Sequence, residues 1–450
     1  MKWLKKWAEL QPEKKYLNDV NFGEMLVQVQ ERAGQLAGLV DGIKRVALLS
    51  ENSIEMAVML FALMGLGKEV LLLNTHLTAD ELYDQLTEPS VTVFFVSDGL
   101  VDKLPGGISF SAVLTEPSVN VVLTDDFADE KITVLMNTSA TTGKFKTVPI
   151  SWGMITNHVK ASAATIGILP DDNWLVVLPM FHVSGLSIIM RSLYNGTRST
   201  ILPKFDEEQI LELVNTGIIN MMSLVPTMLN RIIDRLERHQ LRMILLGGEF
   251  IPQPLMLKAQ AKNLPIYKTY GMTESFSQSV TFNILEFPEK FSSVGRPLPG
   301  VEIEIRQPDK DGAGEIWLRS PMLMKNYLRK APYGKVFETG DIGYLDADGF
   351  LYVLNRRKDI IISGGENIYP KELEDLLYSH PKIRECAVIP RTHDTWGQVP
   401  VLYVASTLTA QEIHDFMAKK LAKYKLPHEI LFMDTLPKNA SGKILRKDLK

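Results

Sequence analysis

Between about residues 46 and 270, short apolar runs alternate with longer amphipathic stretches. The apolar runs predict strands at Val46–Leu49, Glu69–Leu73, Val91–Val96, Ile132–Met136, Trp174–Leu178, Ile219–Met222, Met243–Leu246 and Ile266–Thr269. Most are nearly continuous in valine, isoleucine and leucine, which is typical of strands covered on both faces. Alternation of strands with helices predicts mostly parallel sheets with right-handed crossovers and flanking helices, an α/β fold. Two helix starts, Thr78–Glu81 and Asp206–Gln209, resemble capping boxes.

The pattern changes after about residue 295. Strands predicted at Val301–Ile305, Gly314–Leu318 and Phe350–Leu354 are separated by Pro, Gly and Asp turns, which indicates a small antiparallel region. A helix at 370–379, strands at 386–389 and 400–405, a helix at 409–423 and a strand at 429–433 follow. We expect a domain boundary near Lys358, with a large N-terminal domain at residues 1–357 and a smaller α+β C-terminal domain at residues 358–450.

Composition excludes several classes of function. With 49 Lys and Arg against 53 Asp and Glu, the formal net charge of −4 leaves no basic excess for nucleic acid. The single cysteine, Cys386, excludes a disulfide framework, and we expect it to be buried in a protein of a reducing compartment. Charges interrupt the first ten residues too early for a signal peptide. The longest apolar run, from Ala57 to Gly67, is far shorter than the ~20 residues that span a membrane and predicts a buried helix. We therefore predict a cytoplasmic protein with no membrane partner.

A loop rich in hydroxyl groups follows the strand Ile132–Met136. From Thr138 to Lys146 it contains four hydroxyl residues, one glycine and two lysines. Backbone amides and hydroxyls can donate to phosphate oxygens while an ammonium group offsets the charge. The loop is not a Walker A sequence, because it lacks the Gly-x-x-x-x-Gly-Lys-[Ser/Thr] pattern. On composition alone, it is either a phosphate site or a solvated turn.

Six motifs resemble those of the adenylate-forming superfamily, which includes acyl-CoA synthetases, peptide-synthetase adenylation domains and beetle luciferases. They are the 138–146 loop, Tyr270–Glu274, Gly314–Arg319, Thr339–Asp341, Arg356–Asp359 with Gly364–Glu366, and Pro437–Lys443. Each motif alone has low specificity, but six in order cover nearly the whole chain. The resemblance implies an enzyme that attacks the α-phosphorus of ATP with a carboxylate and then transfers the acyl group to coenzyme A. Cations must offset the charge where two anions meet.

By this resemblance, several segments hold ATP and Mg²⁺. The loop binds the β- and γ-phosphates through Thr138, Ser139, Thr141, Thr142, Gly143 and Lys144. The adenine slot contains Gly248, Glu249, Tyr270 and Gly271, while Thr273 lies next to Glu274, the expected Mg²⁺ ligand. Asp341 accepts hydrogen bonds from the ribose hydroxyls, and Arg356 supports the same region.

The resemblance also implies a mobile C-terminal domain. Its Lys443 reaches the α-phosphate during adenylation, and rotation about Lys358 then presents Gly364 and Gly365 for thioester formation. A polar residue such as Lys358 is equally what a plain linker would contain.

Three residues depart from the family pattern. Ala140, Phe145 and Thr147 stand where the family has Gly, Pro and Gly. If residue 140 needs a positive φ, alanine costs ~1 kcal/mol there, which questions loop mobility or ATP affinity. These departures leave open a nucleotide-binding relative that has lost catalysis.

The segment 178–194 bears on the acid. Members that activate amino acids usually carry an Asp near Phe181 and His182, so this chain argues against an amine substrate, and we expect His182 to line the pocket. Arg191 lies in an otherwise apolar helix, Val183–Tyr194, on one face with Ser184. Either Arg191 faces the pocket and holds a second anionic group of the substrate, or it reaches solvent or pairs with an acidic side chain.

Four segments resemble the o-succinylbenzoate–CoA ligases of bacterial menaquinone biosynthesis. They are 181–186, 270–278, 361–370 and 394–400. The resemblance implies an aromatic dicarboxylate whose aliphatic carboxylate is activated and whose ring carboxylate is held by Arg191, with Ser184 and Gln278 as further pocket candidates. Trp396 either borders the pantetheine tunnel or packs within its own domain. Another aryl or acyl acid, transfer to a carrier protein, and a homo-oligomer stay open.

Overall fold

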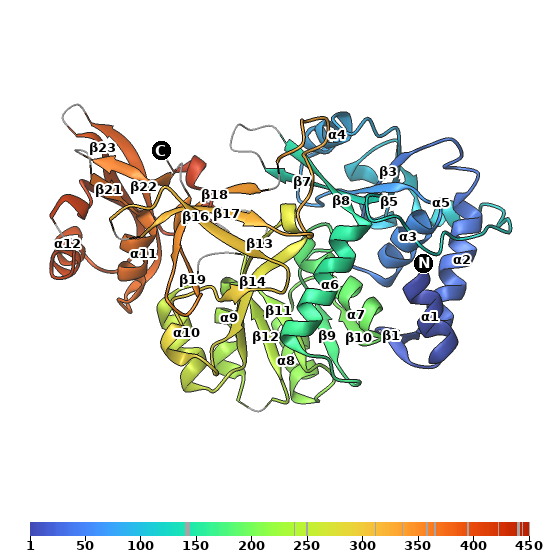
Figure 1. Ribbon diagram of the computed structural model, residues 1–450, viewed down its shortest axis with the longest axis horizontal. Helices are drawn as coiled ribbons and strands as arrows, with labels where there is room; N and C mark the ends of the chain where they lie inside the picture. Colours follow the sequence, from blue (N-terminus) through green and yellow to red (C-terminus); the bar gives the residue numbers. More distant parts are fainter. Residues whose placement is uncertain are drawn as a thin grey trace.

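The strands described by a computed structural model form four sheets (Figure 1). The structure describes residues 1–139, 145–237, 239–248, 251–310, 312–334, 336–356, 359–363, 366–393, 396–421, 423–438, 442 and 444–449.

A six-stranded sheet has the order β6-β5-β3-β4-β7-β8 and is parallel except for the hairpin of β7 with β8. Its strands are β3 (Arg45–Leu49), β4 (Glu69–Leu72), β5 (Val93–Val96), β6 (Ile108–Ser109), β7 (Ile132–Ser139) and β8 (Phe145–Ser151). In the hairpin, Thr138 lies opposite Lys146, so the expected phosphate loop connects these two strands.

A nine-stranded sheet has the order β15-β14-β13-β12-β11-β9-β10-β1-β2. The six strands from β13 to β1 run parallel, and antiparallel strands flank them at both edges. The strands are β1 (Lys15–Leu17), β2 (Val20–Asn21), β9 (Asn173–Val176), β10 (Arg198–Ile201), β11 (Met221–Leu224), β12 (Met243–Leu246), β13 (Ile266–Met272), β14 (Ser277–Asn283) and β15 (Arg296–Pro297).

Two smaller sheets follow in the chain. The antiparallel sheet β16-β17-β18-β19 contains Glu302–Arg306, Gly314–Arg319, Phe337–Leu345 and Leu351–Arg356. The last sheet, β21-β20-β23-β22 with β24 beside β23, contains β20 (Ile361–Ser363), β21 (Glu366–Ile368), β22 (Ile383–His393), β23 (Gly397–Ser406) and β24 (Glu429–Phe432).

Helices cover these sheets. They are α1 (Lys2–Leu10), α2 (Phe22–Leu36), α3 (Ile54–Gly65), α4 (Ala79–Thr87), α5 (Phe110–Leu114), α6 (Trp152–Ile166), α7 (Val183–Asn195), α8 (Glu207–Asn215), α9 (Pro226–Ile232), α10 (Gln253–Ala261), α11 (Pro370–Tyr378) and α12 (Ala410–Ala418). Figure 1 shows α11, α12 and the last sheet at one end of the molecule, next to the small antiparallel sheet, with α1, α2 and α5 at the other end.

The structure confirms the α/β fold class and the burial predictions. Every residue of α3 from Met56 to Gly65 is buried, as expected for the apolar run, and Cys386 is buried too. Among the described residues, no helix is both long and apolar enough to span a bilayer. At α4 the capping box of Thr78 and Glu81 is complete, but at α8 only Asp206 accepts its expected bond, from the backbone N–H of Gln209.

All eight strands predicted between residues 46 and 270 are present, with shifted ends. The prediction at 219–222 was displaced, because β11 begins at Met221. The missed strands include β8, β10, β14 and β18: β14 begins with the three polar residues Ser-Gln-Ser, and β18 contains Thr339-Gly-Asp341. The helix predicted at 409–423 is shorter and ends at Ala418.

Candidate active site

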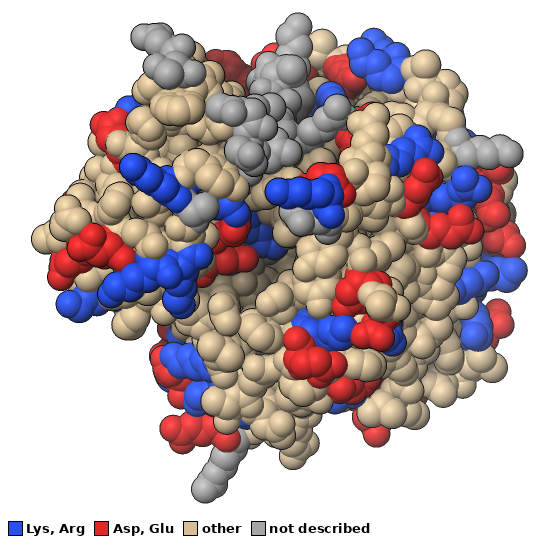
Figure 2. All heavy atoms as spheres, turned by 60° about the vertical axis from the view of Figure 1, so that its left-hand side comes forward, with Lys and Arg blue, Asp and Glu red and all other residues tan. Residues whose placement is uncertain are grey.

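Helix α6 lies between the two large sheets. It contacts β8 of the six-stranded sheet, β14 of the nine-stranded sheet, and α7. Parallel strands β9, β11 and β12 present their carboxyl ends at one edge, where ligands of α/β sheets usually bind. Figure 2, in which the left-hand side of Figure 1 comes forward, shows a hollow with acidic and basic side chains at its rim.

The turn from β9 into α7 is fixed by a residue that sequence reasoning missed. The side-chain amide of Asn52 donates to the carbonyl oxygen of Leu178 at 2.9 Å and accepts from the backbone N–H of Met180 at 2.8 Å. These two bonds hold the segment that leads to His182, the N-cap residue of α7. No local sequence signal marks Asn52, since its partners are more than a hundred residues away.

His182 is neutral in this setting. Burial, and secondarily the nearby His76, lower the pKa of His182 to about 4. Its ring lies against Phe181, with the ring centroids 4.7 Å apart. A neutral, mostly buried imidazole fits the expected role in lining the pocket, and half-buried Ser184 lies in the first turn of the same helix.

We expect the protein to lose stability as the pH falls below 6.5, because folding holds His182 neutral. A group whose folded pKa is about 4, against 6.5 when unfolded, contributes stability that is complete above pH 6.5 and is lost as the pH falls toward 4. At pH 5 the loss is about 2 kcal/mol for this residue. Chemical unfolding at pH 7.5 and pH 5 should therefore show a smaller pH effect in His182→Gln than in the parent. The exposed His414, changed to Gln, is the control and should leave the pH effect as it is.

Arg191 is a buried charge on α7. It is 2% exposed, and its Nη2 atom lies 2.7 Å from Nε2 of His158 and 2.8 Å from Oε1 of Gln278. Burial lowers the pKa of Arg191 to about 9, which leaves the guanidinium charged at pH 7. Among the described residues, its Nε and Nη1 atoms have no hydrogen-bond partner. Arg191 therefore does not reach solvent, and none of the acidic side chains that the structure describes pairs with it.

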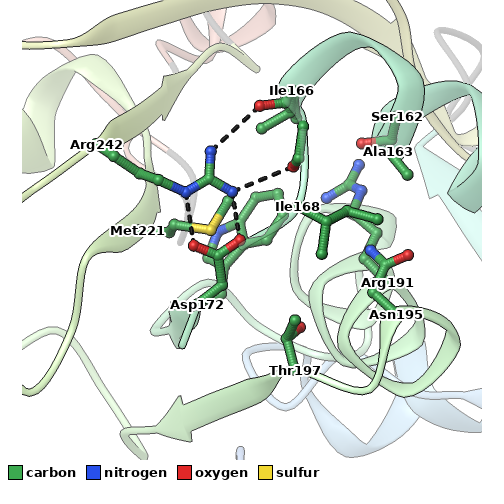
Figure 3. A pocket seen from close by; sticks show the side chains of 12 residues that line it. Ser162, Ala163, Ile166, Ile168, Asp172, Arg191, Asn195, Thr197, Met221 and Arg242 are labelled. Atoms are coloured by element: carbon green, nitrogen blue, oxygen red, sulfur yellow. Dashed lines mark hydrogen bonds and ion pairs between the residues drawn. The ribbon is translucent and has the colours of Figure 1, made fainter. Parts of the chain in front are cut away.

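A small pocket lies beside Arg191 (Figure 3). Ser162 and Trp174 line it, and the guanidinium of Arg191 lies 5.0 Å from the ring centroid of Trp174. Across the pocket, Arg242 donates from Nε to Asp172 at 2.6 Å. The pocket thus contains one arginine that a carboxylate neutralises and one that none of the described residues neutralises. Its residues Asp172, Met221 and Arg242 lie at the amino ends of β9, β11 and β12, away from the carboxyl edge of the sheet.

Glu274 lies beside the end of the expected phosphate loop. The hydroxyl of Tyr327 donates to Oε1 of Glu274 at 2.7 Å, and Nζ of Lys146 lies 5.0 Å from the Tyr327 ring centroid. Burial, and then the charge of Glu274, raise the pKa of Tyr327 well above its usual range, so the hydroxyl remains a donor. Tyr327 was missed because it lies outside the recognised motifs.

The neighbourhood of Glu274 fits Mg²⁺ bound together with phosphate. Within the described ranges, no three His, Cys, Asp or Glu side chains gather so as to hold a metal ion. A magnesium ion usually takes one or two carboxylates and completes its octahedron with substrate phosphates and water.

The structure brings Tyr270 and Asp341 together. The hydroxyl of Tyr270 donates to Oδ2 of Asp341 at 2.6 Å, although the residues lie on different sheets. Gly271 follows at a register shift of β13, where an added Cβ atom would lie 1.6 Å from the carbonyl oxygen of Ser277. Only glycine fits there, because the backbones of β13 and β14 approach closely at this register shift.

The structure describes only some of the other predicted site residues. Gly248 follows β12, Thr273 begins a 3-10 turn, and the backbone of Arg356 pairs with Asp341 across β18 and β19. Outside the described residues lie Ala140, Thr141, Thr142, Gly143, Lys144, Glu249, Lys358, Gly364, Gly365 and Lys443, together with the side chains of Ser139 and Arg356.

Thr147, one of the three departures from the family pattern, has a packing role. Its fully buried hydroxyl lies 2.6 Å from Oε2 of Glu88 and 2.7 Å from Oδ1 of Asn137. These contacts connect β8 to β7 and to the end of α4. The departure at this position therefore has a structural reason and does not argue for lost catalysis.

Two residues of the C-terminal segment, Trp396 and Gly442, have informative surroundings. Trp396 is 49% exposed, so about half of its surface is covered by the chain. Gly442, directly before Lys443, has a φ of +88° and lies against α9, where an added Cβ atom would be 2.8 Å from Oγ1 of Thr227. Because α9 follows β11, the chain next to Lys443 lies at the carboxyl edge of the nine-stranded sheet.

Comparisons with known proteins agree along the whole chain. The sequence matches the AMP-binding enzymes over residues 4–328 and their C-terminal domain over residues 372–443. A 2-succinylbenzoate–CoA ligase of Lactococcus lactis subsp. lactis is 66% identical over 450 residues, covering 100% of both chains. The o-succinylbenzoate CoA synthetase of Bacillus subtilis in complex with the acyl-adenylate intermediate is 35% identical with a TM-score of 0.92, covering 100% of this chain and 98% of that chain. The same enzyme in complex with ATP and magnesium is 35% identical with a TM-score of 0.91, covering 100% and 99%.

Proposed function

The chain belongs to the family of AMP-binding enzymes, and on that premise we propose that it is an ATP-dependent 2-succinylbenzoate–CoA ligase. The aliphatic carboxylate of the acid attacks the α-phosphorus of ATP, which forms the acyl-adenylate and releases pyrophosphate. The thiol of coenzyme A then attacks the acyl carbon, loses its proton and displaces AMP. The product belongs to menaquinone biosynthesis, the pathway named by the sequence resemblance.

One observation carries the choice of acid. Arg191 is buried, charged and without a carboxylate partner among the described residues, and its Nε and Nη1 atoms are unpartnered donors. An isolated buried charge is costly, so such an arginine indicates a ligand that brings the opposite charge. The ring carboxylate of 2-succinylbenzoate supplies it, while benzoate and fatty acids have only the carboxylate that is activated. The 66% identical ligase from Lactococcus lactis supports the same acid.

The nucleotide is proposed to bind along the edge from Tyr270 to the 138–146 loop. Asp341, which Tyr270 orients, accepts the ribose hydroxyls, and Tyr270 stacks on the base. Glu274 holds the Mg²⁺ ion, which when bound offsets phosphate charge. Gly248, Gly271, Thr273 and Arg356 complete this region, and Lys443 of the C-terminal segment approaches the α-phosphate.

Residues 1–357 and 358–450 are proposed to be separate domains, the second of which moves between the two reactions. In support, residues beyond 360 build their own apolar cores, which include Leu373, Val388 and Leu402. The exposed Trp396 is proposed to border the path of coenzyme A, together with Gly364 and Gly365. We also propose a cytoplasmic enzyme without nucleic acid partners, and leave its assembly to a measurement of mass in solution.

The proposal is tested with a panel of acids in a pyrophosphate-release assay. We compare 2-succinylbenzoate, the same acid without its ring carboxylate (4-oxo-4-phenylbutanoate), and benzoate. The expected kcat/KM is highest for 2-succinylbenzoate by at least about 100-fold, the scale of one charged contact. Equal rates with benzoate would overturn the choice of acid. Absence of ATP–pyrophosphate exchange with every acid would overturn the enzyme in favour of a nucleotide-binding protein.

The contact between Tyr270 and Asp341 gives a prediction for the nucleotide. Tyr270→Phe keeps the ring that stacks but removes the hydrogen bond that orients the carboxylate, a loss of about 1 kcal/mol. We expect the KM for ATP to rise about 5- to 10-fold, with the KM for the acid unchanged. Tyr352→Phe is the matched control, because it removes a tyrosine–aspartate bond to Asp346 at a distance from the site. An unchanged KM for ATP in Tyr270→Phe would contradict the role of Asp341.

A further inference from the structure

The described residues that hold Arg191 are all neutral. Its Nη2 atom contacts His158 at 2.7 Å, Gln278 at 2.8 Å and the hydroxyl of Ser277 at 3.5 Å, and its guanidinium lies against the ring of Trp174. Each of these partners can orient the guanidinium, but none supplies a negative charge. The arrangement therefore fixes the position of Arg191, and no carboxylate in the described part of the chain compensates its charge.

His158 is fixed as a neutral acceptor. It is fully buried on α6, and its ring meets Phe276 edge-on at 5.4 Å and 88°. Burial, and then the charge of Arg191, keep the pKa of His158 well below its usual range. An unprotonated Nε2 atom accepts from Arg191 without adding a second charge to the pocket.

Gln278 is fixed by a second donor. Its Oε1 atom accepts from Arg191 at 2.8 Å and from the hydroxyl of Ser162 at 2.9 Å, and the side chain is 1% exposed. A glutamate at this position would have the same shape and could accept the same two bonds. The chain carries the neutral isostere instead, although a carboxylate would stabilise Arg191 in the free protein.

Arg242, the other arginine that lines the pocket, differs from Arg191 because it has a carboxylate partner. Arg242 forms an ion pair with Asp172, in which Nε and Oδ1 are 2.6 Å apart. Both arginines line one pocket (Figure 3), yet only Arg242 has a carboxylate among the described residues. The neutral environment of Arg191 is thus specific to that arginine.

We propose that His158 and Gln278 are positioning residues that keep Arg191 oriented but unneutralised, and that this neutrality sets the preference for a dicarboxylic acid. The inference rests on the proposed function and deepens it. When the ring carboxylate binds, it meets a full positive charge in a place with little water, where attraction is strong. An acid without that carboxylate leaves the charge unpaired and gains nothing from it.

The test introduces one negative charge beside Arg191 without changing shape. In Gln278→Glu we expect the ratio of kcat/KM for 2-succinylbenzoate to that for 4-oxo-4-phenylbutanoate to fall at least about 30-fold, because the new carboxylate neutralises Arg191 and repels the ring carboxylate. At position 158, His158→Glu should lower the ratio similarly, while His158→Gln, a neutral acceptor, should keep it within about threefold. Gln85→Glu, which places a carboxylate at a buried glutamine elsewhere, controls for general destabilisation and should leave the ratio unchanged.

The outcomes test the proposed function and the further inference separately. A parent enzyme without preference between the two acids overturns the proposed function itself. A parent with strong preference, together with Gln278→Glu and His158→Glu proteins that keep it within about threefold, overturns only the inference. If either Glu variant fails to fold, Ser162→Ala decides, because it loosens Gln278 without adding charge: the ratio should fall about three- to tenfold, and no change overturns the inference.

Discussion

Replacing Arg191 with methionine is expected to remove the preference for a dicarboxylic acid and, at the same time, to make the folded protein more stable. The lost contact with the ring carboxylate corresponds to about 3 kcal/mol, so kcat/KM for 2-succinylbenzoate should fall about 100- to 1000-fold. The free protein no longer buries a charge that none of the described carboxylates compensates, and an apolar side chain of similar length fills the place. Steady-state kinetics with the acid panel and thermal unfolding measure the two effects.

The matched control is Arg242→Met, in the same pocket. Arg242 is paired with Asp172, whose side chain is 5% exposed, so this change leaves a buried carboxylate without its partner. We expect a loss of stability of about 3 kcal/mol, with the preference between acids retained. Changes of opposite sign in the stability of the two variants would distinguish a ligand-binding arginine from a structural one. If Arg191→Met lowers stability as Arg242→Met does, Arg191 is a structural residue and the proposed acid loses its main support.

Much of the fold follows from local patterns in the sequence. Continuous apolar runs predicted β3, β4, β5, β7, β9, β12 and β13, each with at least one end within two residues of the observed end. Such runs are needed by parallel strands that are covered on both faces. Strand β14 was not predictable this way, since its polar residues face the site: Gln278 contacts Arg191, and Ser277 lies beside it. A strand that lines a site carries the residues its ligand requires, and its pattern then no longer indicates a strand.

In the candidate site, too, some residues were predictable from local sequence patterns and others were not. Arg191 was recognisable because a charge on an apolar helix needs a partner. Its contact His158 was not, because a histidine on an amphipathic helix has no signal of its own and the two helices meet only in the folded chain. Tyr327 likewise reaches Glu274 from 53 residues away. Contacts between distant segments depend on packing, which spacing along one sequence does not reveal.

The second large effect is expected at Lys443. Lys443→Ala should lower the rate of acyl-adenylate formation about 100- to 1000-fold, the usual cost of removing one donor that stabilises a charged transition state. Thioester formation from acyl-adenylate supplied in the assay should fall less than about tenfold, because no two anions meet in that step. Support comes from Gly442, whose backbone lies against Thr227 at the carboxyl edge of the nine-stranded sheet. ATP–pyrophosphate exchange measures the first reaction, and release of AMP from the supplied adenylate measures the second.

Two further variants make the role of this segment testable. Gly442→Ala places a Cβ atom 2.8 Å from Oγ1 of Thr227 in a backbone with a φ of +88°, so it should impair adenylation while Lys443 is still present. Lys438→Ala is the control, because that lysine pairs with Glu385 at 2.6 Å within its own part of the chain and should affect neither reaction. Equal losses in both reactions for Lys443→Ala would assign the lysine to folding or to nucleotide binding in general. A loss confined to adenylation requires instead that the C-terminal segment delivers its charge to the α-phosphate only in the first reaction. The position of that segment then determines the order of the two reactions.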